Sequence, residues 1–382
     1  IERETLDALG SGYQGNQMAC SCGHSARYVA LLCRHLVSLN GTRRLRRAYY
    51  HCAHCHRGFC PLDARLGIGR GQSSVGVRAL AARFSSYLPF EKATAELEQV
   101  TGIRLSARTV EREAEAVGEA FASLFAEREQ RLWAGQAPRP TARPQRLHVT
   151  MDGVHVPIGK AWKEAKVGSI YQTRPDGGVS HARYLATRAD SAAFGRRLRT
   201  LAHEEGVAFC RQVAVVGDGA EWIWQEAAKH FPQAVEILDY YHVTEHLWEV
   251  ARARYPEEAT AQEWMKTQQE RLLSDRVAAV IAEIEGWAPQ REAERELRRR
   301  VGNYLRHHAH RMRYQTFREA GYPIGSGVAE AGCKSVVQAR LKGTGMRWSE
   351  AGAEAMLHLR AAWCSTGRTD FLAASRRAAL PS

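Results

Sequence analysis

The most constraining feature of the chain is a series of alternating structural patterns between residues 146 and 239. It begins with Arg146–Pro157, where apolar and polar residues alternate as in a strand with one buried face. Two short strand-like runs, an amphipathic helix, a nearly all-apolar strand, a helix and a last strand follow, at residues 167–171, 182–186, 191–205, 212–217, 221–230 and 234–239. This order predicts a mixed α/β core.

Acidic residues stand within or directly after these predicted strands. Asp152 lies in the first strand and precedes Gly153, whereas Asp218 follows the all-apolar strand and precedes Gly219. A carboxylate beside a hydrophobic strand is costly unless it is paired or binds a cation. Oxygen ligands of this kind favour Mg²⁺ or Mn²⁺ over zinc. Since an isolated Asp-Gly pair is more often a turn, neither aspartate is decisive alone.

Cysteines are concentrated near the start of the chain, where six of the nine fall between Cys20 and Cys60. Such clustering at one end of a large chain is typical of a metal site in a reducing compartment, not of a disulfide framework. We predict a structural, DNA-binding zinc ribbon over residues 1–65, with the zinc held by Cys20, Cys22, Cys52 and Cys55. The basic residues around it would suit phosphate contacts, although an arginine run is more often only a solvated face; they are Arg43, Arg44, Arg46, Arg47 and Arg57.

The first cysteine pair is the weaker half of this prediction, because its one-residue spacing is tighter than usual. The alternative is a set of free thiols in a small core. Spare candidate ligands are His24, His51, His54, His56 and Cys60.

Residues 70–135 are rich in Ala, Glu, Arg and Leu at helical spacing and form a second predicted domain. A helix, a turn and a helix fit residues 90–112, because Gly102 can end the first helix and Ser106 can cap the second. A recognition helix would carry its DNA contacts on its first turns, here at Arg108, Thr109 and Arg112. Many purely structural hairpins share this pattern.

A proline-rich stretch at residues 136–145 predicts a stiff linker to a third domain, residues 146–382. Almost everything after residue 244 has a helical pattern. Within it, the charged stretch Leu305–Arg313 contains three histidines, and a phosphate-facing or solvated surface is favoured there over a metal site.

The net charge favours a polyanionic partner. Lys and Arg number 54 against 41 Asp and Glu, which gives a net charge of +13 and a pI of about 9.5. Nucleic acid is the first expectation and an anionic membrane surface the second. No apolar run of about 18 residues is present to span a bilayer, so we expect no membrane and a cytoplasmic, nucleoid-associated protein.

Several separated motifs give the chain a specific resemblance. Met151-Asp-Gly153, Val216-Gly-Asp-Gly219, Leu238-Asp-Tyr-Tyr-His-Val243 and Ile324-Gly-Ser-Gly-Val-Ala-Glu330 occur in that order, followed by Arg340-Leu-Lys-Gly-Thr-Gly-Met-Arg-Trp348. In this order and setting the chain resembles bacterial insertion-sequence transposases, closest to the Kra-type branch, which is similar to the Mutator-like superfamily.

The resemblance implies an RNase-H-like catalytic core with a DDE triad at Asp152, Asp218 and Glu330. It also implies a supporting D-x-x-H element at Asp239 and His242, and a helical insertion at about residues 246–320. Asp239 ends a predicted strand as well and competes with Asp218 for the second position; Asp218 is favoured.

The activity implied is metal-dependent phosphodiester hydrolysis and strand transfer at the ends of an insertion sequence. Two Mg²⁺ or Mn²⁺ ions per active site would serve this chemistry. The expected partners are double-stranded DNA, as terminal inverted repeats and target, and further copies of the chain in a homodimer or larger homo-oligomer. The alternatives are an inactive or domesticated DNA-binding protein and, less favoured, an RNA-cleaving nuclease.

Three tryptophans have two alternative roles. Stacking on flipped or frayed bases is conceivable for Trp222, Trp224 and Trp348, but core packing is the favoured interpretation.

Overall fold

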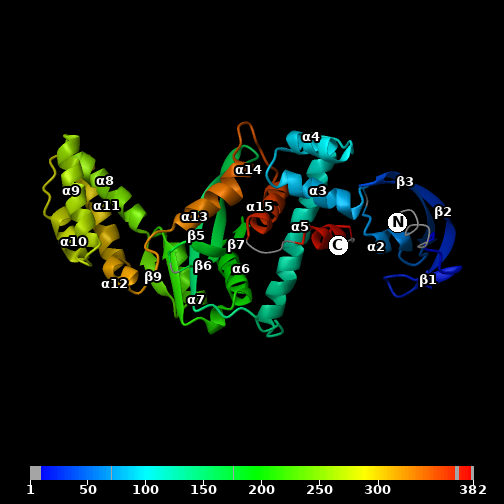
Figure 1. Cartoon of the computed structure of the whole chain (residues 1–382), viewed down its shortest axis with the longest axis horizontal. Coiled ribbons are helices and arrows are strands. Elements are labelled where there is room, and N and C mark those ends of the chain that lie inside the picture. Colours follow the sequence, from blue (N-terminus) through cyan, green and yellow to red (C-terminus); the bar gives the residue numbers. More distant parts are fainter. Residues whose placement is uncertain (1–9, 70, 175, 366–369, 380–382) are drawn as a thin grey trace. The chain divides into compact units, whose positions relative to one another are not determined.

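The computed structural model describes residues 10–69, 71–174, 176–365 and 370–379, so residues 1–9 of the predicted ribbon domain lie outside the described part. The chain forms two compact units (Figure 1). The first comprises residues 1–127, 343–363 and 368–382, and the second comprises residues 128–342 and 364–367. The predicted mixed α/β organisation is confirmed, with one sheet in each unit.

A four-stranded antiparallel sheet begins the first unit. Its order is β1-β2-β3-β4, with bounds Gln17–Ala19, Ser25–Ser38, Gly41–His51 and Gly58–Phe59. Gly41 turns β2 into β3 with a φ of 98°, a conformation that favours glycine. Fully buried Ala26, Ala48 and Tyr50 form a small core beside two of the paired cysteines, Cys20 and Cys52.

Helices make up the rest of the first unit, namely α2 (Pro61–Leu66), α3 (Val75–Ser85), α4 (Phe90–Thr101), α5 (Ala107–Trp133), α15 (Glu350–Cys364) and α16 (Phe371–Arg377). The helix, turn and helix lie where the sequence predicts them. Gly102 ends α4 in the left-handed conformation, and the Ser106 hydroxyl accepts the Thr109 N–H at 3.2 Å.

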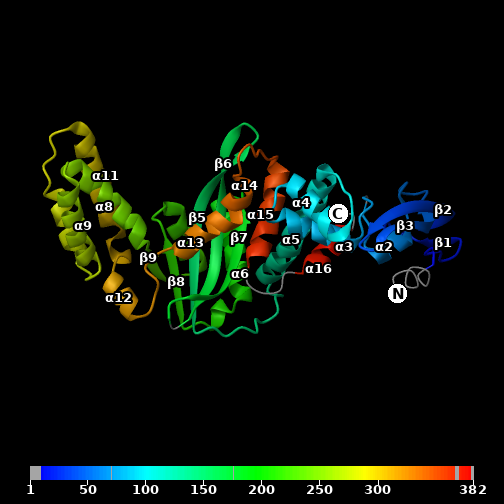
Figure 2. The ribbon, with the colours of Figure 1, turned by 45° about the horizontal axis from the view of Figure 1, so that its top comes forward.

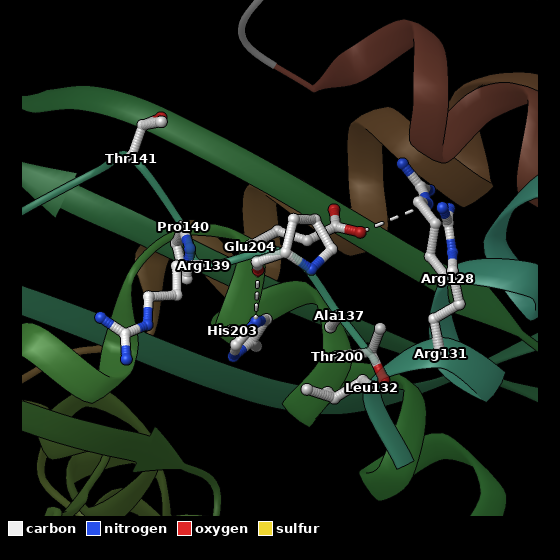
Figure 3. A pocket seen from close by; sticks show the side chains of 11 residues that line it. Arg128, Arg131, Leu132, Ala137, Arg139, Pro140, Thr141, Thr200, His203 and Glu204 are labelled. Atoms are coloured by element: carbon white, nitrogen blue, oxygen red, sulfur yellow. Dashed lines mark hydrogen bonds and ion pairs between the residues drawn. The ribbon is translucent and has the colours of Figure 1, made fainter. Parts of the chain in front are cut away.

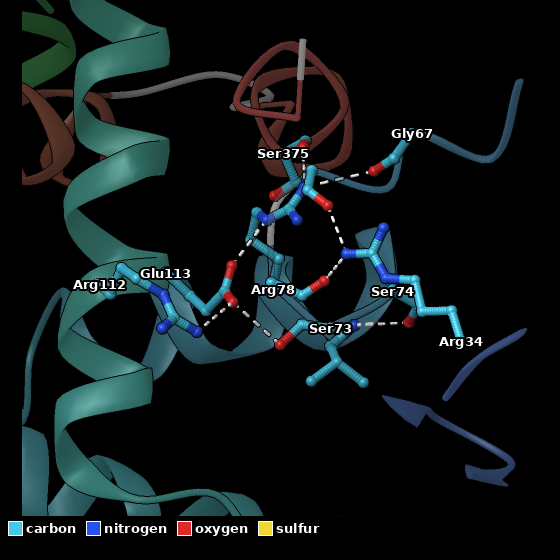
Figure 4. A network of polar contacts seen from close by, with 11 residues as sticks. Arg34, Gly67, Ser73, Ser74, Arg78, Arg112, Glu113 and Ser375 are labelled. Atoms are coloured by element: carbon cyan, nitrogen blue, oxygen red, sulfur yellow. Dashed lines mark hydrogen bonds and ion pairs between the residues drawn. The ribbon is translucent and has the colours of Figure 1, made fainter. Parts of the chain in front are cut away.

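A buried ion pair holds three of these helices together (Figure 4). The Arg78 guanidinium on α3 donates to Glu113 of α5 at 2.8 Å and to the Ser375 carbonyl of α16 at 2.7 Å. Ser73 donates to the same carboxylate at 3.1 Å. Because Arg78 and Glu113 are 2% and 3% exposed, losing either partner would leave an uncompensated buried charge.

The second unit contains a five-stranded mixed sheet of order β7-β6-β5-β8-β9, and its strands are Val179–Thr187, Ala161–Thr173, Arg146–Ile158, Gln212–Gly217 and Val235–Leu238. The first three strands pair antiparallel, whereas β8 and β9 continue parallel from β5. Residues of β8 are almost completely buried, as expected of an apolar strand inside a sheet.

Helices cover both faces of this sheet (Figure 2). Consecutive residues of a strand face opposite sides. A side chain at Gly168 would meet Phe194 and Leu198 of α6 (Ser191–Glu204), whereas on the other face Gly332 of α13 (Gly327–Gly332) lies against Val167. Helix α7 (Glu221–His230) lies between β8 and β9 in the chain.

A helical stretch separates β9 from α13, over the range in which the resemblance implies an insertion. It comprises α8 (Tyr240–Arg254), α9 (Glu258–Leu272), α10 (Val277–Glu285), α11 (Glu292–His308), a 3₁₀ turn (Ala309–Arg311) and α12 (Tyr314–Glu319). Among the described residues, no helix combines the length and apolarity needed to cross a membrane.

The end of the chain differs from the sequence prediction. Residues 343–363 and 368–382 belong to the first unit, although the sequence analysis placed them with the catalytic domain. The reason is long-range packing. Gly118 of α5 lies directly against Ala355 of α15, and Phe121 of α5 packs on Phe371 of α16 with ring centroids 5.4 Å apart.

The predicted linker at residues 136–145 has no helix or strand, but it is anchored (Figure 3). Residues 137–141 line a pocket of about 340 Å³ with the last turns of α5 and with α6. The Pro138 carbonyl lies 3.3 Å from His203 Nε2, and beside it Arg128 pairs with Glu204 at 3.3 Å. The His203 contact holds the segment against α6, within the second unit.

Candidate functional site

Strand register brings the first two carboxylates to the same level. The parallel pairing of β5 with β8 ends at Thr150 and Val216. Asp152 and Asp218 each lie two residues beyond that pair, at corresponding positions of neighbouring strands. The Asp218 charge is close enough to raise the pKa of Asp152.

Glu330 reaches this neighbourhood from the helical side. It lies on α13, which continues directly into a π-helix, Cys333–Gln338, and then α14 (Ala339–Leu341). The Cys333 thiol donates to Asp152 Oδ2 at 3.1 Å. Burial raises the pKa of this thiol, and the charges of Asp152, Asp218 and Glu330 raise it further. All three carboxylates therefore contribute to the raised pKa of the Cys333 thiol.

The carboxylates differ in their surroundings. Burial raises the pKa of Asp152, opposed by hydrogen bonds from the Cys333 thiol and from the Gly153 N–H, which lies 2.6 Å from Oδ1. Asp218 Oδ1 accepts the Ala220 N–H at 3.0 Å. Glu330 has a side chain 65% exposed and pairs with Lys334 at 2.5 Å, a surface ion pair of little energetic weight.

Asp239 performs a different task from Asp218. Its Oδ1 accepts the N–H groups of Tyr241 and His242 at 2.7 and 3.4 Å, which caps α8. Its Oδ2 accepts the Ser326 N–H at 2.9 Å and the Ser326 hydroxyl. Both oxygens are thus engaged, Oδ1 in capping α8 and Oδ2 in holding the segment that leads into α13 and Glu330.

Tight packing explains why glycine stands at position 325, in the segment that leads into α13. A side chain at Gly325 would collide with the ring of Tyr241. The Tyr240 N–H also donates to the Ile324 carbonyl at 2.8 Å. The start of α13 is therefore positioned by the end of β9 and by α8.

The helical stretch packs back onto the Asp218 loop. Gly219 has a φ of 103°, and a side chain there would also collide with the ring of Tyr304 on α11. The Tyr304 hydroxyl donates to the Asp218 carbonyl at 2.8 Å. An electrostatic interaction with His242, on the first turn of α8, is among the contributions that oppose the burial-raised pKa of Asp152, so His242 lies near the same site.

The cysteine cluster could hold a metal ion such as zinc. The sulfurs of Cys20, Cys22, Cys52 and Cys55 lie within 4.8 Å of one another. Cys20 and Cys55 are 3.6 Å apart and Cys22 and Cys52 are 3.7 Å apart; tetrahedral zinc with Zn–S bonds near 2.3 Å places sulfurs about 3.8 Å apart.

The thiols of the cluster differ in their pKa values, because burial and the neighbouring cysteines raise the pKa of Cys22 to about 12. A backbone hydrogen bond from Cys22 lowers the pKa of Cys20 to about 6. Of the spare ligands, His24 and His54 form a second close group with Cys22, and their rings stack with centroids 3.5 Å apart.

The candidate DNA-contacting residues lie on the first turns of α5. Arg108 and Arg112 are exposed and Thr109 is partly exposed. The tryptophans mostly follow the core interpretation, because Trp224 is 5% and Trp348 is 7% exposed. Trp222 is partly buried under Lys166, whose ammonium lies 5.4 Å from its ring.

The expected surface at Leu305–Arg313 needs one correction. His308 is only 3% exposed and packs on Tyr304, with ring centroids 4.9 Å apart. Burial lowers the pKa of this imidazole to about 4. His307 and His310 are exposed as expected.

Sequence reasoning missed three residues of the site, namely Ser326, Cys333 and Tyr304. Cys333 had a usable signal, because it lies three residues after Glu330 and a helix places such residues on one face. Tyr304 had none, since 86 residues separate it from the Asp218 carbonyl that it binds.

A family model matches most of the chain. It describes UPF0236, an uncharacterised protein family, and it matches residues 27–371, from the second strand of the ribbon to α16. The chain belongs to this family. The match includes both units and every carboxylate discussed above. None of the curated proteins compared with this UPF0236 member matches it.

Proposed function

We propose that this protein is a DNA transposase that cuts and joins DNA at the ends of an insertion sequence. The observation that carries the proposal is the matched position of Asp152 and Asp218, each two residues past the last β5–β8 pair, with Glu330 three residues before Cys333, whose thiol donates to Asp152. Such clustering of carboxylates is unfavourable unless a cation compensates it.

The donor set fits hard divalent cations. Asp152, Asp218 and Glu330 offer only oxygen ligands, which suit Mg²⁺ or Mn²⁺. When bound, a pair of such ions would activate a water or a 3′-hydroxyl and stabilise the leaving oxygen of an in-line displacement. The chain's own contribution is positional: Asp239 orients the start of α13 through Ser326, and Tyr304 steadies the Asp218 loop.

The architecture supports an RNase-H-like assignment for the second unit. Three antiparallel strands are followed by two parallel ones with helices between them, and the two aspartates stand on the central neighbours β5 and β8. Asp218 is favoured over Asp239 as a cation ligand, since both oxygens of Asp239 already hold backbone and hydroxyl donors.

Double-stranded DNA is the proposed substrate, as terminal inverted repeats and as target. The basic charge and the exposed Arg108 and Arg112 on α5 support this partner. Joining two ends also requires two active sites to meet, so the protein is proposed to act as a homodimer or larger homo-oligomer.

The test replaces one carboxylate at a time. Asp152→Asn, Asp218→Asn and Glu330→Gln should each reduce Mg²⁺-dependent cleavage and strand transfer by at least about a hundredfold, as expected of groups that act together. The assay uses purified protein and the terminal repeats of its own element. DNA binding should persist in all three variants, because it is assigned to other residues.

Asp239→Asn distinguishes the two assignments of the second aspartate. It should lower the melting temperature, because it weakens the cap of α8 and the hold on Ser326. Full loss of cleavage with Asp239→Asn but not with Asp218→Asn would reverse the assignment. A parent protein that binds its ends and never cuts them would instead indicate an inactive or domesticated DNA-binding protein.

A further inference from the structure

The β2–β3 hairpin (Figure 1) carries arginines on both of its faces, as the strand register shows. On one face, Arg34 and Arg47 both pair with Asp63 of α2, Arg34 at 3.2 Å. Buried Leu36 and Leu45 pack beneath them with Ile68. The charges of Arg34 and Arg47 on this inner face are therefore compensated by Asp63, and the apolar residues beside them are buried.

The opposite face of the hairpin carries basic side chains at the residues that alternate with those of the inner face. Cross-strand partners share a face, and the pairs here are Cys33 with Arg46 and His35 with Arg44. With Leu31, these residues form what we call the outer patch: Leu31, Cys33, His35, Arg44 and Arg46. All five are exposed.

The outer patch has no acidic neighbour in sequence. Residues 8–62 contain seven arginines and neither Asp nor Glu, so Asp63 is the first carboxylate after the hairpin. That carboxylate serves Arg34 and Arg47 on the inner face. Within the described parts of the chain, no carboxylate pairs with Arg44 or Arg46; Arg44 contacts the Cys33 sulfur at 3.3 Å.

We propose that the outer patch enters the major groove of double-stranded DNA, an inference that rests on the proposed function and names one of its contact surfaces. A major groove about 12 Å wide admits a two-stranded ribbon. Arg44 and Arg46 are two residues apart on one strand, roughly 7 Å, which matches about two base-pair steps.

The residue types suit this location. A guanidinium can donate two hydrogen bonds to the major-groove edge of guanine or bind the flanking phosphates. Exposed Leu31 offers an aliphatic surface to thymine methyl groups. Inner-face Arg34 and Arg47 instead stabilise the ribbon and contact no DNA.

The experiment compares two double variants with the same loss of charge. Arg44→Ala/Arg46→Ala removes the outer-patch arginines. The control, Arg295→Ala/Arg299→Ala, removes exposed arginines of α11 that are paired with Glu292 and Glu296. Zinc content and circular dichroism verify that each variant is folded.

The measurement is affinity for a duplex of arbitrary sequence about three helical turns long, across a salt series, together with dimethyl sulfate protection of guanine N7. The outer-patch variant should bind at least about tenfold more weakly, with a salt slope smaller by about two, and should lose N7 protection. The control should match the parent.

Equal binding, salt slope and protection in the outer-patch variant and the parent would overturn the inference. Loss of binding to phosphatidylserine vesicles with unchanged DNA binding would overturn it in favour of a membrane surface. If the parent cuts its own ends and the outer-patch variant binds DNA normally, only the outer-patch inference is refuted. If the parent binds no duplex at any salt concentration, the proposed function is refuted as well.

Discussion

At the scale of single residues, the three proposed cation ligands differ in solvation. Asp152 is largely desolvated, and its thiol donor Cys333 is buried, whereas the Glu330 side chain is 65% exposed. A buried carboxylate prefers to be neutral unless a cation is present. If the proposed cation binds, Asp152 is therefore the residue at which folding and metal binding should be most strongly coupled.

This coupling predicts a pH-dependent stability effect. Burial raises the pKa of Asp152 in the folded state above its value in the unfolded chain. The protonated carboxyl therefore stabilises the folded protein below the unfolded pKa, and this stabilisation is lost as the pH rises through the folded pKa. In metal-free protein, Asp152→Asn should therefore raise the melting temperature near pH 7 and have little effect below about pH 4. Thermal unfolding across this pH range measures it.

A suitable control for this effect is Asp176→Asn, because that side chain is 70% exposed. It should leave the melting temperature unchanged at every pH. With Mg²⁺ present, the parent should gain stability that Asp152→Asn does not gain, because binding to the folded state stabilises it. A variant that melts below the parent at pH 7 without metal would contradict the prediction.

At the scale of elements, the long helix α5 packs very closely against α15. Gly118 faces the Ala355 carbonyl of α15, and a methyl group there would overlap that backbone oxygen. Only glycine lets the two helices approach so closely. This contact helps to recruit residues 343–363 into the first unit.

Gly118→Ala should thus destabilise the protein by about 1–3 kcal/mol, as overpacking does, although alanine is the better helix former. Gly302→Ala in α11 is the matched control. Its methyl group would meet Glu285 Cγ at an ordinary 3.9 Å, so it should stabilise by up to about 1 kcal/mol. Denaturant unfolding reports both; a stabilising Gly118→Ala would disprove the close packing.

At the scale of the whole molecule, each unit has its own sheet, and the cysteine cluster that could hold a metal lies in the first unit. Three of the four cysteines lie in or against the small core of the first sheet, namely Cys20, Cys52 and Cys55, whereas Cys22 is exposed. So small a core has few apolar contacts to replace a lost metal. The five-stranded sheet of the second unit contains none of the four cysteines.

Zinc removal should therefore loosen one unit and spare the other. A chelator, or Cys52→Ser, should remove one zinc per chain and increase hydrogen exchange in β1–β4, with β5–β9 unchanged. Cys210→Ser, a partly buried cysteine outside the cluster, should retain the zinc. A parent without zinc, or Cys52→Ser with full zinc content, would refute the site.

Much of the local structure follows from the sequence alone. Alternation predicts β5, an all-apolar run predicts β8, and Gly102 and Ser106 mark the turn between α4 and α5. Such features depend on neighbours within a few residues. The same holds for the two close cysteine pairs, whose spacing already suggests a shared metal.

Only the tertiary structure decides which distant residues meet. It distinguishes Asp239, whose oxygens cap α8 and hold Ser326, from Asp218, although both follow apolar strands. It buries His308 within a charged stretch, and it places the final helices with the ribbon instead of with the carboxylates. These outcomes depend on packing between segments tens to hundreds of residues apart, and no local pattern of charge or hydrophobicity encodes which surfaces will meet.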